Sequence, residues 1–239
     1  GAVENLRIEP AVNGAGKHAL VIRIRAGFFV STWMVDRVHL GDFGQQGLYL
    51  DNSAANTDGI FTGTVRRSFI ENGIRGDSVT IEGNSITNGP SRFSGPGLVG
   101  VDISTVPGAA ESTIKDNNIT TGGGCVWIRN GTGIGVLNNW CETAGAPVSG
   151  GGLIHLSNCS ECTVRDNRVQ TLGGDAQFAV VIDGGQLNAI DSNKLTAGKA
   201  GHIAFTNGAS QNRLVGLNRF TGGPDALTGK IVGAETGLQ

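Results

Sequence analysis

The sequence predicts an all-β solenoid in which short parallel strands stack coil upon coil. Two repeats support this prediction: an asparagine pattern that occurs six times, and pairs of apolar residues that return about every 26 residues. Each period also lacks the 3.6-residue apolar spacing of a helix, and contains period-2 alternation separated by Gly, Asn and Asp. Helices are therefore expected to be essentially absent.

The asparagine repeat has an apolar residue, an Asn three positions later, and a second apolar residue two positions after that. Its six copies are Ile81-Asn84-Ile86, Ile114-Asn117-Ile119, Val136-Asn139-Cys141, Val164-Asn167-Val169, Ile190-Asn193-Leu195 and Val215-Asn218-Phe220, and Val35-Val38-Leu40 and Val65-Ser68-Ile70 continue it upstream without Asn. Identical side chains in a parallel in-register stack lie about 4.8 Å apart. We therefore expect each amide to hydrogen-bond to the next in a ladder and to hold the turn backbone.

The second repeat consists of apolar pairs on short strands. The pairs are Ile22/Ile24, Leu48/Leu50, Ile74/Gly76, Val101/Ile103, Val126/Ile128, Ile154/Leu156, Val180/Ile182 and Ile203/Phe205, with first members 26, 26, 27, 25, 28, 26 and 23 residues apart. Ile231 follows after another 28, which predicts about nine coils, with the regular part at about residues 20–222. Propeller blades need about 40 to 50 residues per repeat, and leucine-rich repeats need a regular Leu consensus, so both are excluded.

Composition limits the partners of the chain. Its 239 residues carry a net charge of −2 from interspersed acidic and basic residues, whereas duplex nucleic acid and anionic membrane surfaces require concentrated positive charge. The apolar runs are far shorter than the ~18 to 20 residues of a membrane helix. We therefore predict no nucleic acid and no membrane partner.

The cysteines are not expected to bind a metal. The pair Cys159-x-x-Cys162 lacks a second ligand pair, and inward Cys141 and Cys162 are predicted to pack as small hydrophobes.

Three coils resemble a known family. They are Ser78-Val79-Thr80-Ile81-Glu82-Gly83-Asn84-Ser85-Ile86-Thr87-Asn88, Ser112-Thr113-Ile114-Lys115-Asp116-Asn117-Asn118-Ile119 and Cys162-Thr163-Val164-Arg165-Asp166-Asn167-Arg168-Val169. These segments are similar to the right-handed parallel β-helices of the pectate-lyase-like superfamily, which includes polysaccharide lyases, hydrolases, epimerases and phage tailspikes. Residues 33–50 and Asn138-Asn139-Trp140-Cys141-Glu142 resemble phage tailspikes and capsule depolymerases.

The resemblance implies a right-handed, single-stranded parallel β-helix that occupies residues 1–239 as a single domain of a larger protein. It also implies a homotrimer, because fibres of this family are commonly trimeric and a thin solenoid gains from lateral association. The implied location is the virion tail, outside the cell, with a secreted bacterial enzyme as the alternative.

Residues that alternate with the inward columns should face solvent along one flat side. The first outward column reads Arg23, Tyr49, Arg75, Asp102, Trp127, His155, Val181 and Ala204, and the second reads Arg25, Asp51, Asp77, Ser104, Arg129, Ser157, Asp183 and Thr206. Aromatic, acidic, basic and imidazole groups gather in coils two to six, whereas the later coils carry apolar or small residues. This asymmetry predicts a functional face, although any solvent-facing strand can carry mixed charges.

A bacterial surface polysaccharide, such as capsule, O-antigen or another polyuronate, suits this face. Flat aromatic side chains stack on sugar rings, so Tyr49 and Trp127 are the predicted stacking residues. Planar guanidinium groups bind carboxylates through two hydrogen bonds, which assigns Arg75 and Arg129 to uronate recognition. Asp51 is predicted to contribute to substrate binding beside them.

Two cleavage chemistries remain open, together with a non-catalytic glycan-binding shaft. Hydrolysis needs two carboxyl groups roughly 5 to 10 Å apart, which Asp77 and Asp102 on adjacent coils satisfy, with Glu142 at an adjoining edge. In β-elimination, Arg129, His155 or Tyr49 could neutralise a uronate or act as the base. No cofactor is expected, apart from a possible Ca²⁺ between the stacked Asp51 and Asp77.

Overall fold

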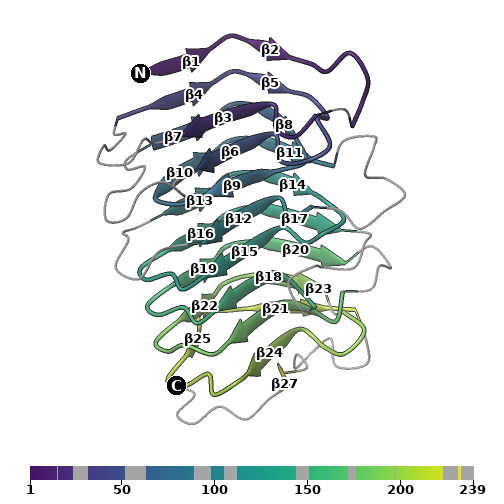
Figure 1. Cartoon of the computed structure of the whole chain (residues 1–239). Coiled ribbons are helices and arrows are strands. Elements are labelled where there is room, and N and C mark those ends of the chain that lie inside the picture. Colours follow the sequence, from purple (N-terminus) through teal and green to yellow (C-terminus); the bar gives the residue numbers. More distant parts are fainter. Residues whose placement is uncertain are drawn as a thin grey trace.

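The computed structural model describes residues 1–14, 16–23, 32–51, 63–88, 98–104, 112–143, 151–171, 176–196, 198–222 and 231–232. This part of the chain winds into a tall stack of coils with β1 (Ala2–Glu4) at one end and β27 (Ile231–Val232) at the other (Figure 1). The paired strands are parallel throughout and form three sheets of nine strands each. No described segment is a helix long and apolar enough to cross a membrane.

Each coil contributes one strand to each sheet. Sheet A contains β1 (Ala2–Glu4), β4 (Met34–Asp36), β7 (Gly63–Arg66), β10 (Val79–Glu82), β13 (Thr113–Lys115), β16 (Gly135–Leu137), β19 (Thr163–Arg165), β22 (Ala189–Asp191) and β25 (Arg213–Val215). Sheet B contains β2 (Arg7–Ile8), β5 (His39–Leu40), β8 (Phe69–Glu71), β11 (Ser85–Thr87), β14 (Asn118–Thr120), β17 (Trp140–Thr143), β20 (Arg168–Thr171), β23 (Lys194–Thr196) and β26 (Arg219–Thr221). Sheet C contains β3 (Leu20–Arg23), β6 (Leu48–Asp51), β9 (Ile74–Gly76), β12 (Val101–Ser104), β15 (Val126–Arg129), β18 (Gly152–Ser157), β21 (Phe178–Asp183), β24 (Ile203–Thr206) and β27 (Ile231–Val232).

The predicted all-β parallel solenoid is confirmed, and its core is a stack of aliphatic columns. In sheet A, the inward residues Val65, Ile81, Ile114, Val136 and Val164 lie opposite one another and are fully buried. Alternating strand residues point into the coil or outward, so this column requires the period-2 pattern of the sequence. The core therefore leaves the outward residues of all three sheets in vertical columns.

The predicted asparagine ladder lies at the turn between sheets A and B. Asn84 is the first member, and from Asn117 to Asn218 the Oδ1 atom of each ladder Asn accepts hydrogen bonds from the backbone N–H and the Nδ2 of the preceding one, at 2.9 to 3.2 Å. Each Nδ2 also donates to the carbonyl of an inward residue one coil away, for example Asn117 to Ile81 at 2.9 Å. Buried polar groups must be paired. The ladder pairs these amides with groups of the neighbouring coils, and the same bonds hold successive coils in register.

A second, shorter ladder joins sheets C and A. Asn188 donates from its backbone N–H and its Nδ2 to the Oδ1 of Asn212, at 2.9 and 2.8 Å. Its own Oδ1 accepts from the backbone N–H of Cys162 at 3.0 Å. These asparagines occur in two coils only, so they did not stand out as a repeat in the sequence.

The predicted register is wrong at both ends of the stack. In β3, Leu20 and Ile22 pair with Leu48 and Leu50, so the outward residues are Val21 and Arg23. Ile24 and Arg25 lie outside the described residues.

At the other end of the stack, Leu214 of β25 pairs with Ile190, while Val215 faces outward and is 43% exposed. The turn that follows β25 contains Gly216, Leu217 and Asn218, one residue more than the Gly83-Asn84 turn, which shifts the pattern.

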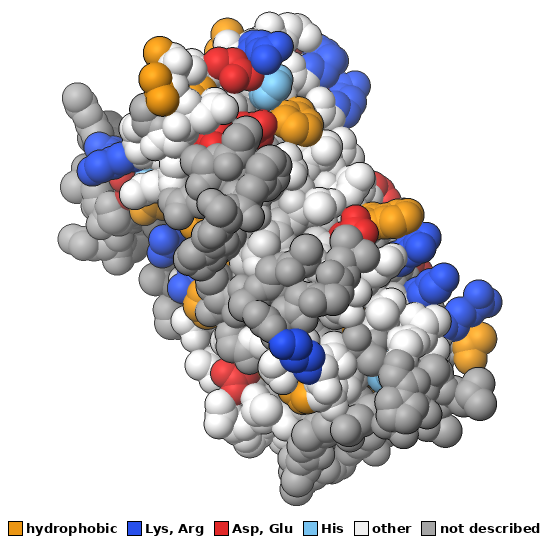
Figure 2. Space-filling view, turned by 90° about the vertical axis from the view of Figure 1, so that its right-hand side faces the viewer, with side chains coloured by type: hydrophobic (Ala, Val, Ile, Leu, Met, Phe, Trp, Pro, Cys, Tyr) orange, Lys and Arg blue, Asp and Glu red, His pale blue; other side chains and the backbone are white. Residues whose placement is uncertain are grey.

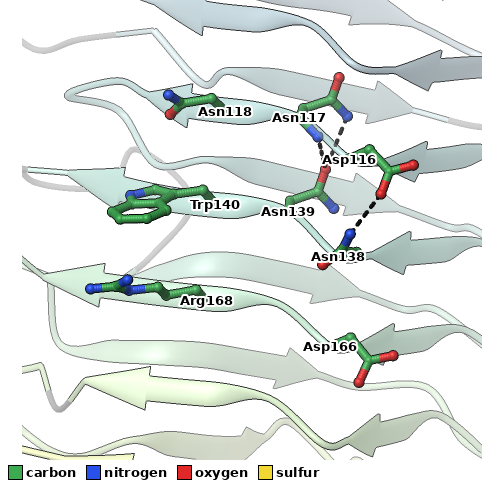
Figure 3. Close-up of a pocket in the computed structure, with 8 residues that line it drawn as sticks. All are labelled: Asp116, Asn117, Asn118, Asn138, Asn139, Trp140, Asp166 and Arg168. Carbon is green, nitrogen blue, oxygen red and sulfur yellow. Dashed lines mark hydrogen bonds between the residues drawn. The ribbon is translucent and has the colours of Figure 1, made fainter.

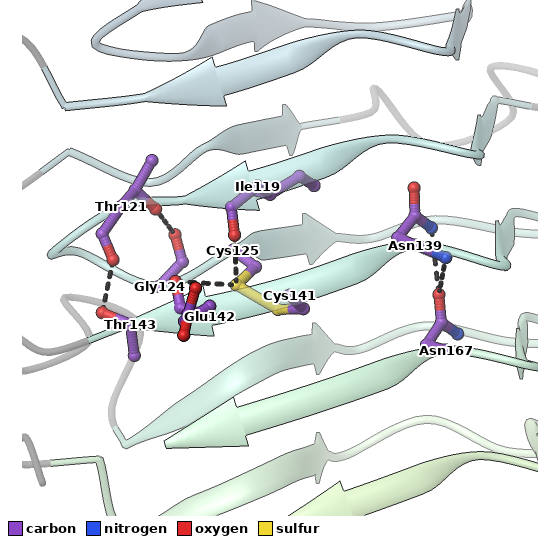
Figure 4. Close-up of a disulfide and its surroundings, with 9 residues drawn as sticks. All are labelled: Ile119, Thr121, Gly124, Cys125, Asn139, Cys141, Glu142, Thr143 and Asn167. Atoms are coloured by element: carbon purple, nitrogen blue, oxygen red, sulfur yellow. Dashed lines mark hydrogen bonds between the residues drawn. A yellow bond between two sulfur atoms is a disulfide. The ribbon is translucent and has the colours of Figure 1, made fainter. Parts of the chain in front are cut away.

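Cys141 is inward and buried as predicted, but it is not a free thiol. It forms a disulfide with Cys125, which lies immediately before β15, across a Cα–Cα distance of 5.8 Å (Figure 4). The bond ties β17 of sheet B to the residue that precedes β15, the sheet C strand of the same coil. Cys159 and Cys162 are free and buried.

We expect Asn117→Ala to destabilise the fold by about 3 kcal/mol, because it leaves the Ile81 carbonyl and the Asn84 N–H buried without these hydrogen bonds. Urea unfolding measures the loss. The matched control is Asn118→Ala, which removes the exposed neighbour on β14 and should change stability by less than about 0.5 kcal/mol. Equal losses in the two variants would contradict a stabilising ladder.

The disulfide predicts that denatured, non-reduced protein exposes two reactive thiols, which a thiol-labelling count measures. Reduction should lower stability by about 3 kcal/mol, since the bond closes a loop with a sequence separation of 16 residues. The Cys159→Ala/Cys162→Ala double variant should then show no reactive thiol before reduction. Four reactive thiols in the non-reduced protein would show that the bond does not form.

Candidate functional site

The outward face of sheet C brings most of the predicted site residues into one column. The strand register places Tyr49 opposite Arg75, Arg75 opposite Asp102, Asp102 opposite Trp127, and Trp127 opposite His155. The column thus spans five consecutive strands, from β6 to β18. Its top differs from the prediction, because Val21, and not Arg23, lies opposite Tyr49.

Asp102 lies at the centre of this column between two guanidinium groups. Its carboxylate contacts Arg129 through Oδ1, and its Oδ2 lies 3.6 Å from Nε of Arg75. Each arginine also lies over an aromatic ring: the Cζ of Arg129 is 4.3 Å from the Trp127 centroid, and that of Arg75 is 6.0 Å from the Tyr49 centroid. The five side chains therefore form one continuous group in which each aromatic ring is positioned by a cation.

A hydrogen-bonded extension continues the group toward the C-terminal coils. Nε1 of Trp127 donates to Oγ of Ser157 at 3.3 Å, and the same Oγ lies 3.1 Å from Nε2 of His155. That nitrogen is also 3.8 Å from Oδ2 of Asp183, whose other oxygen accepts from Thr206 at 2.7 Å. The hydroxyl and the carboxylate approach the same imidazole nitrogen, so these residues do not form a Ser-His-Asp relay, which uses both nitrogens.

Sequence reasoning placed Ser157 and Asp183 in the second outward column but gave them no role. Their position beside His155 is what connects them to the site, and this position could be read from the register. His18, for which the sequence predicts no role, also adjoins the column: its ring centroid lies 4.7 Å from that of Tyr49. No repeat signals His18, because it lies between β2 and β3, before the predicted regular coils.

Three predicted residues are less accessible than expected. Asp51, Asp77 and His155 are each 5% exposed. Asp51 accepts a 2.7 Å hydrogen bond from Nε of Arg23, and Asp77 accepts one from Oγ of Ser78 at 3.2 Å. Both aspartates lie at or just beyond a strand end, and Asp51 is held by Arg23 of the neighbouring strand β3.

Glu142 does not join this group. It lies on β17 in sheet B, opposite Thr120 and Gln170, whereas the other predicted residues belong to sheet C or follow it. The residue comes directly after inward Cys141, so its side chain must face outward from sheet B.

A Ca²⁺ ion takes about six to eight oxygen ligands. Asp51 is engaged by the Arg23 guanidinium at 2.7 Å. No group of three or more His, Cys, Asp or Glu side chains gathers within the described residues. We therefore assign no metal-dependent step to Asp51 and Asp77.

A known family matches most of the chain. The family model described as "Right handed beta helix region" covers residues 28–218. The chain belongs to this right-handed β-helix family. The predicted handedness is thereby confirmed. A search of curated proteins found no significant match.

Solved structures of DFA-IIIase from Arthrobacter chlorophenolicus A6 are similar to this β-helix. The enzyme in complex with GF2 matches with a TM-score of 0.66 at 14% identity, over 97% of this chain and 62% of the DFA-IIIase chain. Its C387A mutant matches with a TM-score of 0.64 at 13% identity, over 96% and 57%. At such identities the likeness shows the fold alone, and this chain spans less than two thirds of the enzyme's length.

Burial raises the pKa of Asp102 above the ordinary aspartate value, and Arg129 and Arg75 oppose this shift. We therefore expect Arg129→Gln to raise this pKa further, as measured by carbon-13 NMR titration of the carboxyl group. The folded state holds this proton more tightly than the unfolded state, so stability should increase as pH falls through the range between the two pKa values.

Asp102→Asn is the control, because it removes this part of the pH dependence. An unchanged Asp102 pKa in Arg129→Gln would contradict the assigned contact between the two side chains.

Proposed function

We propose that this β-helix binds and depolymerises a bacterial surface polysaccharide along the outward face of sheet C. The observation that carries the proposal is the unbroken series of contacts from Tyr49 to Asp183, which combines aromatic, cationic, acidic and imidazole groups. A glycan chain can lie across the strands of a β-helix, because a column offers one side chain per coil at a regular spacing.

The spacing of the aromatic residues fits an extended ligand. Three strand steps separate Tyr49 from Trp127, or about 14 Å at the usual strand spacing. Sugar rings would stack on the two aromatic side chains, with Arg75 and Arg129 between them. Each guanidinium has five N–H donors, so an arginine that contacts Asp102 keeps donors for hydroxyl or carboxylate groups of the ligand.

Asp102 is the acid in the proposed hydrolysis. Burial raises its pKa above that of an ordinary aspartate, and in its protonated form the carboxyl group can donate to the glycosidic oxygen as that bond breaks. Asp77 follows the strand that pairs with β12, and would direct a water or attack the sugar carbon from the other side. In β-elimination, Arg129 would instead neutralise the uronate and His155 would take the C5 proton, while the bond between C4 and the glycosidic oxygen breaks and that oxygen takes a proton from water.

Two further observations support a carbohydrate ligand and an extracellular setting. DFA-IIIase, whose β-helix is similar in fold, is a carbohydrate-active enzyme crystallised with the sugar GF2. Disulfides such as Cys125–Cys141 persist mainly in oxidising compartments. We therefore keep a homotrimeric, tailspike-like assembly in the virion tail as the proposed context, with a secreted enzyme as the alternative.

A non-catalytic glycan-binding shaft is the second candidate function. It is favoured by the two ion pairs of Asp102 and by the 5% exposure of Asp77. A carboxylate held between two arginines stabilises the fold and presents the guanidinium groups without itself transferring a proton. The two candidates share one binding face and differ only in cleavage.

A panel of capsular and O-antigen polysaccharides tests the proposal. Binding is measured by affinity electrophoresis, hydrolysis by reducing ends, and elimination by ultraviolet absorbance of an unsaturated uronate. We expect Trp127→Ala to weaken binding roughly tenfold through loss of aromatic contact with the sugar. Asp102→Asn should abolish cleavage while binding persists.

Phe69→Ala is the matched control, because it removes a 37% exposed aromatic residue from sheet B and should bind as wild type does. Binding without cleavage of any glycan would support the shaft. Unaltered binding in Trp127→Ala would overturn the sheet C site.

A further inference from the structure

A second outward column, on sheet B, has a different character. The register aligns Asn118, Trp140, Arg168, Lys194 and Arg219 on five consecutive strands, from β14 to β26. Trp140 is 41% exposed, and the three cations that follow it are exposed as well. Figure 2 shows Lys and Arg side chains gathered along the lower right edge of the molecule, next to hydrophobic and acidic side chains.

A surface pocket of about 360 Å³ opens beside Trp140. Asn118 and Arg168 flank the indole on its own sheet, and Asp116, Asn138 and Asp166 line the pocket from the turn between sheets A and B (Figure 3). The Cζ atom of Arg168 lies 4.1 Å from the Trp140 ring centroid. Nδ2 of Asn138 donates to Oδ1 of Asp116 at 2.7 Å, which fixes both groups at the rim.

The three cations of this column are not paired with acidic side chains of the part of the chain that the structure describes. Among the described residues, Arg168, Lys194 and Arg219 take part in no ion pair. Adjacent strands lie about 4.8 Å apart, so the register holds three like charges close together, which is unfavourable in the isolated protein. An anionic ligand that crosses the strands would remove this repulsion.

We propose that this column, defined as Asn118, Trp140, Arg168, Lys194 and Arg219, is a second binding site for an anionic polysaccharide. A sugar ring stacks on Trp140, and successive carboxylates of a polyuronate chain pair with Arg168, Lys194 and Arg219. Asp116 and Asn138 accept hydrogen bonds from hydroxyl groups at the pocket. The proposal rests on the proposed function in one respect, namely that the ligand is a glycan.

The acidic rim favours a glycan over single-stranded nucleic acid. An exposed Trp beside a row of cations also suits base stacking and phosphate binding. However, Asp116 and Asp166 line the pocket in which the ring stacks, and their carboxylates accept hydrogen bonds. Each sugar of a glycan carries hydroxyl groups that donate such bonds, whereas the deoxyribose-phosphate backbone of single-stranded DNA has no donor within the chain.

Binding of three polymers by the whole chain tests the site: polygalacturonate, neutral dextran and single-stranded oligothymidylate. We expect Trp140→Ala to weaken polygalacturonate binding roughly tenfold. Arg219→Gln should weaken it severalfold and reduce its salt dependence, because an ionic contact is lost. The charge-matched control is Arg213→Gln, an exposed cation on sheet A, which should bind as wild type does.

Three results would overturn the proposal: wild-type affinity in Trp140→Ala, equal losses in Arg219→Gln and Arg213→Gln, or tighter binding of oligothymidylate than of polygalacturonate. Trp127→Ala separates this site from the one on sheet C. Loss in Trp140→Ala with no loss in Trp127→Ala would support the sheet B site and contradict the sheet C site. The reverse pattern would contradict the sheet B site alone.

Discussion

The in-register stacking of the asparagines at the turn between sheets A and B is the constraint on which the rest of the structure depends. Each buried amide bonds both to the next amide and to a carbonyl of a neighbouring coil, so a coil cannot slip without leaving polar groups unpaired. Slippage by one residue would also turn every inward side chain outward. The ladder and the aliphatic columns therefore impose the same register.

That register explains why the columns of the central coils could be predicted from the sequence. Residues about 26 positions apart become neighbours, so the series from Tyr49 to His155 followed directly from the repeat. The inward positions were equally predictable, because period-2 alternation admits one assignment once the repeat is aligned. Much of the fold and the main column of the site thus follow from spacing alone.

The remaining features depend on geometry that spacing does not contain. One extra residue in the turn after β25 moved Val215 outward, and β3 pairs two residues away from the position that an even period implies. The contacts of Ser157 with Trp127 and His155 depend on side-chain rotamers. The Cys125–Cys141 bond depends on how the chain turns from β14 into β15, and Glu142 lies outside the predicted face because its strand, β17, belongs to sheet B.

The two outward columns differ in how their charges are balanced, and this difference bears on function. On sheet C, Asp102 lies between Arg75 and Arg129, so the protein itself compensates the cations. On sheet B, Arg168, Lys194 and Arg219 follow one another without an anion in the column, and the register that stabilises the core holds them there. The contact of Arg168 with Trp140 favours the folded state, but like charges on adjacent strands repel, and no anion of the column offsets that repulsion. A bound anionic ligand would supply the negative charge that the column lacks. An extended anionic glycan can place one carboxylate next to the cation of each strand.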